Sequence, residues 1–150
     1  MATLATLTVT MSNEFGDMSD PNKVILDWLS TDLGVVSLAI CSTYITAQGV
    51  FKPHPKKLQG FLRSIETIPG LLGDKTTTVP TTLYDITILD SYGYDISGGI
   101  LADRSASVAE KEVPTEPLFV DSELTLTIAN AGDAKTGRII LEIVPDSRVK

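Results

Sequence analysis

The chain has 150 residues, of which 43% are hydrophobic and 21% charged, and it carries a formal net charge of −7 at pH 7. A chain of this size buries roughly 70% of its unfolded surface, so one domain over residues 1–150 is expected. The acidic balance argues against DNA or RNA as a direct partner, because phosphate binding draws its affinity from cationic side chains. Cys41 is the only cysteine, which excludes an intramolecular disulfide, fits synthesis in a reducing compartment and suggests buried packing.

No segment has the pattern of a membrane span or a secretion signal. The longest apolar run, residues 33–40, is interrupted by Gly34 and Ser37 and falls short of the ~20 residues that cross a bilayer. Residues 1–10 lack a cationic start and alternate threonine with apolar residues, which is typical of a strand. A soluble protein with no membrane partner is expected.

Strands are expected through the first half of the chain. Residues 3–11 alternate between two sides, the period of a strand with one half-buried face. One side has Thr3, Ala5, Leu7, Val9 and Met11, and the other has Leu4, Thr6, Thr8 and Thr10. Residues 12–21 are rich in Gly, Pro, Asn and Asp and are expected to form a connection. Further strands are expected over residues 23–29, which hold the only tryptophan, Trp28, and over 35–41, 44–51 and 61–68. A helix over 56–68 is the alternative for the last of these.

Two hairpins are expected in the second half. The first covers about residues 83–101, with a glycine-bearing turn at 91–93, and the second covers about 122–144, with its turn near 130–137. Strands with turn signals at short intervals, and no sustained helical period, predict an all-β fold in a single domain, either a β-sandwich or a small barrel.

The segments around these hairpins are expected to be irregular or extended. Residues 70–79 are expected to form a surface loop, and 104–112 allow a short helical turn. The prolines in residues 112–120 favour an extended arm, because each proline pushes its predecessor out of the helical region. Residues 1–12 are the other expected extended segment.

No residue pattern predicts a catalytic, cofactor or metal site. His54 is the only histidine and lies between two prolines, so a loop side chain is its expected role. Asp85, Asp90, Asp95 and Asp103 fall on or near the first hairpin, where a carboxylate pair is what a hydrolase or a cation site would need. Aspartates that enter glycine turns normally cap the turn backbone, and this structural role is the one expected here.

Three other features have a functional and a structural interpretation. Tyr92 and Tyr94 offer a stacking platform for a sugar, whereas Tyr84 alternates with isoleucines and is expected to face the core. The basic residues near His54 are expected to be a solvated loop, and the alternative is local contact with an acidic surface. These basic residues are Lys52, Lys56, Lys57 and Arg63.

The second half of the chain resembles a family of small virion proteins of tailed bacteriophages. The resemblance lies in a proline-led Tyr-Asp-x-Thr strand at residues 80–90, an Asp-x-x-Gly-x-Asp turn at 90–95 and an Asn-Ala-Gly hairpin at 124–134. It spans about residues 79–144. The chain departs from the pattern at Ser91 and Tyr92, where acidic residues are common in such proteins, and this makes a catalytic or metal role for the turn less credible.

The resemblance implies a non-enzymatic decoration or cement protein that binds the capsid lattice. Its implied partners are the major capsid protein and copies of itself, in a homo-oligomer such as a trimer. The implied location is the capsid surface of the virion, after synthesis in the host cytoplasm. A head-to-tail connector or a tail or baseplate protein is the nearest alternative, and a carbohydrate-binding adhesion module that uses Tyr92 and Tyr94 is another.

Binding to a shell requires apolar anchors that reach a neighbouring subunit. Phe51, Leu118 and Phe119 are the candidate interface residues, and ordinary core packing is the competing interpretation of each. The acidic surface is expected to keep free subunits apart before they assemble.

Overall fold

The fold was analysed in a computed structural model, which describes residues 4–11, 22–40, 42–45, 51–54, 58–70, 79–115 and 118–144. All regular structure in these ranges is β, so the expected all-β fold is confirmed. The same ranges contain no helix long and apolar enough to cross a bilayer. The strands are β1 (Thr6–Met11), β2 (Asn22–Leu29), β3 (Val36–Ala39), β4 (Ser42–Ile45), β5 (Phe51–His54), β6 (Leu58–Pro69), β7 (Asp85–Leu89), β8 (Glu110–Glu112), β9 (Leu118–Ser122), β10 (Thr125–Ala129) and β11 (Thr136–Val144).

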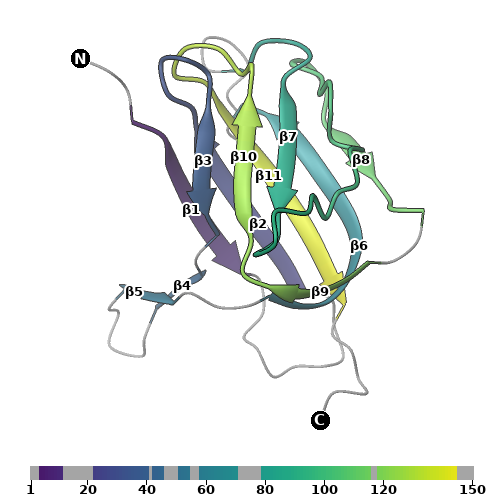
Figure 1. The fold of residues 1–150 in the computed structure, drawn as a ribbon. Helices are drawn as coiled ribbons and strands as arrows, with labels where there is room; N and C mark the ends of the chain where they lie inside the picture. Colours follow the sequence, from purple (N-terminus) through teal and green to yellow (C-terminus); the bar gives the residue numbers. More distant parts are fainter. Residues whose placement is uncertain are drawn as a thin grey trace.

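The strands build two antiparallel sheets that face each other as layers (Figure 1). The larger sheet has six strands in the order β1-β2-β11-β6-β8, with β9 also paired to β6. The smaller sheet has the order β3-β10-β7, and β4 and β5 form a separate pair. Strands β8 and β9 follow one another along the same edge of β6, because β8 pairs with residues 65–67 and β9 with 58–62.

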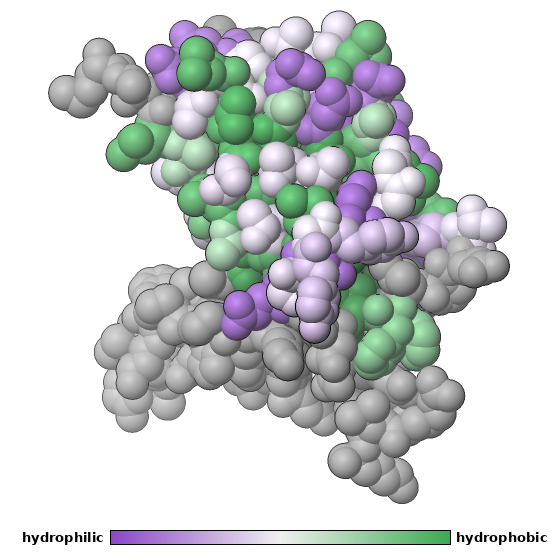
Figure 2. All heavy atoms as spheres, viewed as in Figure 1, coloured by the Kyte–Doolittle hydropathy of each residue, from purple (hydrophilic) through white to green (hydrophobic). Residues whose placement is uncertain are grey.

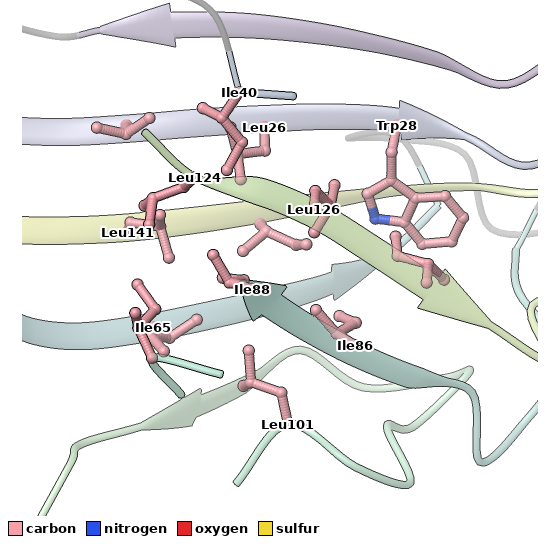
Figure 3. Close-up of a cluster of buried hydrophobic side chains, with 14 of the residues drawn as sticks. Leu26, Trp28, Ile40, Ile65, Ile86, Ile88, Leu101, Leu124, Leu126 and Leu141 are labelled. Atoms are coloured by element: carbon pink, nitrogen blue, oxygen red, sulfur yellow. The ribbon is translucent and has the colours of Figure 1, made fainter. Parts of the chain in front are cut away.

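The core lies between the sheets and follows from strict alternation in the strands. In β7 and β10 every second residue is buried and the residues between are partly exposed. Figure 3 shows these side chains meeting those of β2, β6 and β11 in the space between the layers. The largest fully buried side chains are Trp28, Tyr84, Leu26, Leu62, Ile65, Ile86, Ile88, Leu101, Leu124, Leu126, Ile128 and Ile139. The predicted core orientation of Tyr84 is therefore confirmed.

The outward face of the smaller sheet carries small hydroxyl side chains. Thr127 in the central strand β10 pairs with Ser37 of β3 and with Thr87 of β7. Figure 2 shows weakly polar side chains over the middle of this face. This face can remain exposed to water, because the hydroxyl groups of threonine and serine are readily hydrated.

The expected hairpin at 83–101 is present in an irregular form. A tight turn follows β7, in which the amide of Gly93 donates to the carbonyl of Asp90 at 3.0 Å. The chain then returns along β7 without forming a regular strand. Ile96 donates to the carbonyl of Ile88 at 2.8 Å, and Ile86 donates to that of Leu101 at 3.1 Å.

The expected hairpin at 122–144 is wrong. β10 pairs with β3 and β7 in the smaller sheet, whereas β11 pairs with β2 and β6 in the larger one. The connection at 130–135 is thus a corner that takes the chain from one layer to the other. Asn130, Gly132 and Ala134 adopt φ values of 63°, 91° and 50°, and these left-handed conformations reverse the chain sharply. Alternation predicted both strands but did not specify the neighbour of either.

The prediction of a single strand over 44–51 is also wrong. Ser42–Ile45 and Phe51–His54 are separate strands that pair antiparallel, with Tyr44 opposite Lys52. Pro53 is compatible with this pair, because a two-stranded ribbon leaves one side of each strand without ladder bonds. The Cys41 prediction, the connection expected over 12–21 and residues 71–78 of the loop expected over 70–79 lie outside the described residues.

The strand expected over 61–68 is confirmed against its helical alternative. β6 covers Leu58–Pro69 and pairs with β11, with a register shift next to Glu142. The helical turn allowed for 104–112 is absent, and the chain there forms bends and then β8. The arm expected over 112–120 contains β9 from Leu118 onward.

Tyr84 gives the fold a specific response to alkali. Burial of its phenol raises its pKa strongly, Arg104 lowers it by a smaller amount, and Glu110 raises it further. The unfolded chain releases this proton near pH 10, so the contribution of Tyr84 to stability is constant below that pH and falls as pH rises above it. In a titration of tyrosinate absorbance, Tyr84, one of the four tyrosines, is expected to ionise only when the protein unfolds. Replacement by phenylalanine should remove that late step, and its persistence in the variant would contradict the assignment.

Candidate interaction surface

The predicted turn-capping role of the aspartates is what the structure shows. Oδ1 of Asp90 accepts hydrogen bonds from the amides of Tyr92 and Tyr94, both at 2.9 Å. Oδ1 of Asp95 accepts from Ile88 at 3.2 Å and from the Ser97 amide at 3.0 Å. These carboxylates fix the backbone of the return segment.

Of the other two aspartates, Asp85 uses its carboxylate to hold the segment that contains Asp103. Asp85 accepts from the amide of Asp103 at 2.9 Å and from the side-chain amide of Asn130 at 3.0 Å. Among the described residues no group of three His, Cys, Asp or Glu side chains is arranged to hold a metal ion. The hydrolase hypothesis for Asp90 and Asp95 gains no support from this geometry.

Tyr92 and Tyr94 both project from the turn after β7. Their side chains are 95% and 60% exposed. The Asp90 cap holds the backbone of both, so the two rings are presented on a defined loop.

Phe119 is the candidate interface residue whose side chain the structure places. It is 40% exposed, and its ring meets that of Phe61 edge-on, with 5.2 Å between centroids. Core packing is therefore incomplete for this side chain. Phe51 lies in β5 and Leu118 in β9, but their side chains are outside the described part of the chain.

A hollow of about 510 Å³ lies beside this aromatic pair. We call it the β6 groove, and it is lined by Phe61, Leu62, Arg63, Val113, Pro114 and Val144. The lining comes from three segments that meet at the start of β6 and the end of β11 (Figure 1). Apart from Arg63, every lining side chain is apolar.

β6 and β11 approach each other closely beside the β6 groove. Gly60 has a φ of 147°, and a β-carbon there would lie 2.6 Å from the carbonyl oxygen of Val144. Arg63 stands at the rim, where its guanidinium pairs with Glu142 at 3.3 Å. The Arg63 side chain is 65% exposed, so this ion pair adds little stability but places a charge beside an apolar hollow.

The buried guanidinium of Arg104 stabilises the wall of the groove that Val113 and Pro114 form. Arg104 is 7% exposed in its side chain, and Nη2 donates to Glu112 at 3.2 Å and to the carbonyl of Ile100 at 3.1 Å. Glu112 immediately precedes Val113 and Pro114, so this pair fixes the wall that they form. Nη1 of Arg104 is buried without a hydrogen-bond partner in the described structure.

The β6 groove can bind apolar side chains of a partner. Its lining residue Phe61 contacts Phe119, which lies beside the groove, and of these two only Phe119 was a candidate from the sequence. The groove also uses Val113 and Pro114, for which the only sequence signal was an apolar residue next to a proline after the charged run 110–112. Comparison of the chain with protein-family models, with curated proteins and with solved structures finds no match.

Proposed function

We propose that the protein is a non-enzymatic structural protein of a tailed-phage virion that binds the capsid lattice and stabilises it as a decoration or cement protein. The observation that supports a binding role is the β6 groove together with the exposed ring of Phe119, which packs on the groove residue Phe61. Aromatic side chains beside an apolar hollow are typical anchors of protein interfaces. The nature of the partner rests on the family resemblance of residues 79–144.

The mechanism of such a protein is binding energy alone. A protein that attaches to the assembled shell and not to free capsid subunits shifts the equilibrium toward the shell by mass action. Many copies on one shell multiply the effect, and oligomers of the decorating protein add avidity. The net charge of −7 keeps free copies soluble until they meet the shell.

Replacing Phe119 with serine tests this proposal. The change removes an exposed ring and its contact with Phe61, so we expect binding to purified capsids that lack the protein to weaken by about tenfold or more. Co-sedimentation with the capsids measures it. Val108, an exposed valine before β8, provides the matched control, because Val108→Ser removes apolar surface away from the groove and should leave binding unchanged.

Thermal unfolding of both variants shows that they are folded. Full occupancy of capsids by the Phe119→Ser variant would contradict the groove as the docking surface. Electron microscopy of the complex then decides the position: copies over the whole head support decoration, and a single ring at one vertex supports the connector alternative. If capsids bind none of the protein but a glycan does, and Tyr92→Ala abolishes that binding, the adhesion-module alternative replaces this proposal.

A further inference from the structure

The end of the molecule opposite the β6 groove is built from three loops, residues 30–35, 79–84 and 130–135 (Figure 1). Backbone hydrogen bonds join them. Ala131 donates to the carbonyl of Gly34 at 3.1 Å and accepts from Thr81 at 2.8 Å. Ala134 donates to the carbonyl of Thr31 at 3.1 Å. The corner between the two sheets therefore ties the other two loops together.

Side chains make this end rigid. The buried hydroxyl of Ser30 donates to the carbonyl of Gly132 at 2.8 Å and accepts from the amide of Lys135 at 2.9 Å. Gly34 lies so close to the corner that a β-carbon on it would approach the amide nitrogen of Gly132 to 2.6 Å. A surface carried on these loops is preorganised, which reduces the entropy lost on binding.

Three apolar side chains project from this rigid end, and we call them the leucine apex: Leu33, Val35 and Leu83. Their exposed fractions are 82%, 39% and 58%. The hydroxyl of Thr31 accepts from the amide of Leu33 at 3.2 Å and from that of Val35 at 3.3 Å, which fixes the turn that carries Leu33. Figure 2 shows hydrophobic side chains beside hydrophilic ones at this end.

Leu83 has a backbone conformation that is unfavourable for a residue with a side chain. Its φ is +65°, in the left-handed region where a β-carbon is crowded and glycine is favoured. The side chain is more than half exposed, so burial does little to offset that strain. An exposed leucine that folding disfavours at its position is better explained by a contact outside the chain.

The rim of the leucine apex is acidic. Asp32 is exposed next to Leu33, Asp103 is exposed opposite the start of β7, and Asp133 is exposed on the corner. Lys135 lies on the same corner and is partly buried. Carboxylates next to exposed apolar side chains favour a partner that presents cationic and apolar groups together.

We propose that the leucine apex is a second docking surface, whose partner is a protein segment in which apolar side chains alternate with lysine or arginine. A second copy of this chain is disfavoured, because a two-fold contact would bring identical acidic rims together. Nucleic acid and anionic membranes are disfavoured because their negative charges would repel the carboxylates of the rim. The inference does not depend on the role of the β6 groove, and a protein with both surfaces connects two partners at opposite ends.

The test uses a short synthetic peptide of alternating leucine and lysine, and the same peptide with glutamate in place of lysine. Titration by calorimetry should show saturable binding of the lysine peptide, with far weaker binding of the glutamate peptide. The double variant Leu33→Ser, Leu83→Gly should reduce that affinity by about tenfold or more. Salt at about 1 M, where the Debye length is about 3 Å, should weaken binding by the intact protein.

The variants separate binding from folding. Leu83→Gly relieves the positive φ, so the variant should be at least as stable as the parent protein. Phe119→Ser should leave peptide binding unchanged, which separates this proposal from that for the β6 groove. Absence of peptide binding, equal binding of the glutamate peptide, or affinity unchanged in the double variant would each overturn the proposal. Sedimentation that shows a dimer lost in the double variant would assign the surface to a second copy instead.

Discussion

A Gly137→Ala variant is expected to lose about 3 kcal/mol of unfolding free energy or more, the upper range for overpacking a core. A β-carbon on Gly137 would overlap the indole of Trp28 and lie 2.6 Å from its Cε2 atom. The ring has no room to withdraw, because Trp28 is 1% exposed and packs against Tyr84 with centroids 5.8 Å apart. Equilibrium unfolding in urea gives the difference.

A double-mutant cycle identifies the cause of that loss. Trp28→Leu alone should cost about 3 kcal/mol by leaving a cavity. Combined with Gly137→Ala, it should cost much less than the sum, because the added methyl group then occupies space that the indole has left. Additive losses would show that Gly137 serves the backbone and not the tryptophan. A Gly137→Ala variant within about 0.5 kcal/mol of the parent would contradict the packing itself.

Removal of the Glu112 carboxylate has the second largest expected effect. Glu112→Ala leaves the guanidinium of Arg104 buried without its ion-pair partner, and one nitrogen of that group already lacks a hydrogen bond within the described structure. Loss of one partner of a buried pair costs about 3–5 kcal/mol. Glu112 is 36% exposed in its side chain, so solvent screening reduces the expected loss to about 2–3 kcal/mol.

Replacing both partners provides the control for Glu112→Ala. Arg104→Met combined with Glu112→Leu should restore stability to within about 1 kcal/mol of the parent, since apolar side chains of similar size need no compensating charge. Glu112→Ala should also increase amide hydrogen exchange in β8, next to the wall of the β6 groove. A double variant as unstable as Glu112→Ala would show that packing, and not charge, is what Arg104 supplies.

Local features of the fold were predictable because they depend on neighbours in sequence. Alternation placed Leu7 and Val9 of β1, and Ala5 just before it, on the covered side, and all three are partly or fully buried. It also placed Tyr84 in the core. The capping role of Asp90 followed from its position before a glycine turn, and the structure shows both expected backbone bonds.

Pairing between distant strands could not be predicted in the same way. β10 and β11 each have one buried face, and that pattern is equally satisfied by a hairpin or by strands in opposite layers. The β6 groove was missed for a related reason. Phe61, Val113 and Val144 come from three segments whose meeting depends on how β8 and β11 both pair with β6. Phe119 was a candidate interface residue, whereas its partner Phe61 was not. The sequence alone does not show whether either ring faces the core or the surface.

The central place of β11 in the larger sheet has a consequence for biosynthesis. It lies between β2 and β6, which are joined to it and not to each other. A nascent chain that has left the ribosome only as far as residue 135 therefore has two half-sheets with a gap between them, and the edges of β2 and β6 that face the gap stay unpaired until β11 emerges. The larger layer is expected to close only after β11 has emerged, and until then chaperones or aggregation compete for the open edges.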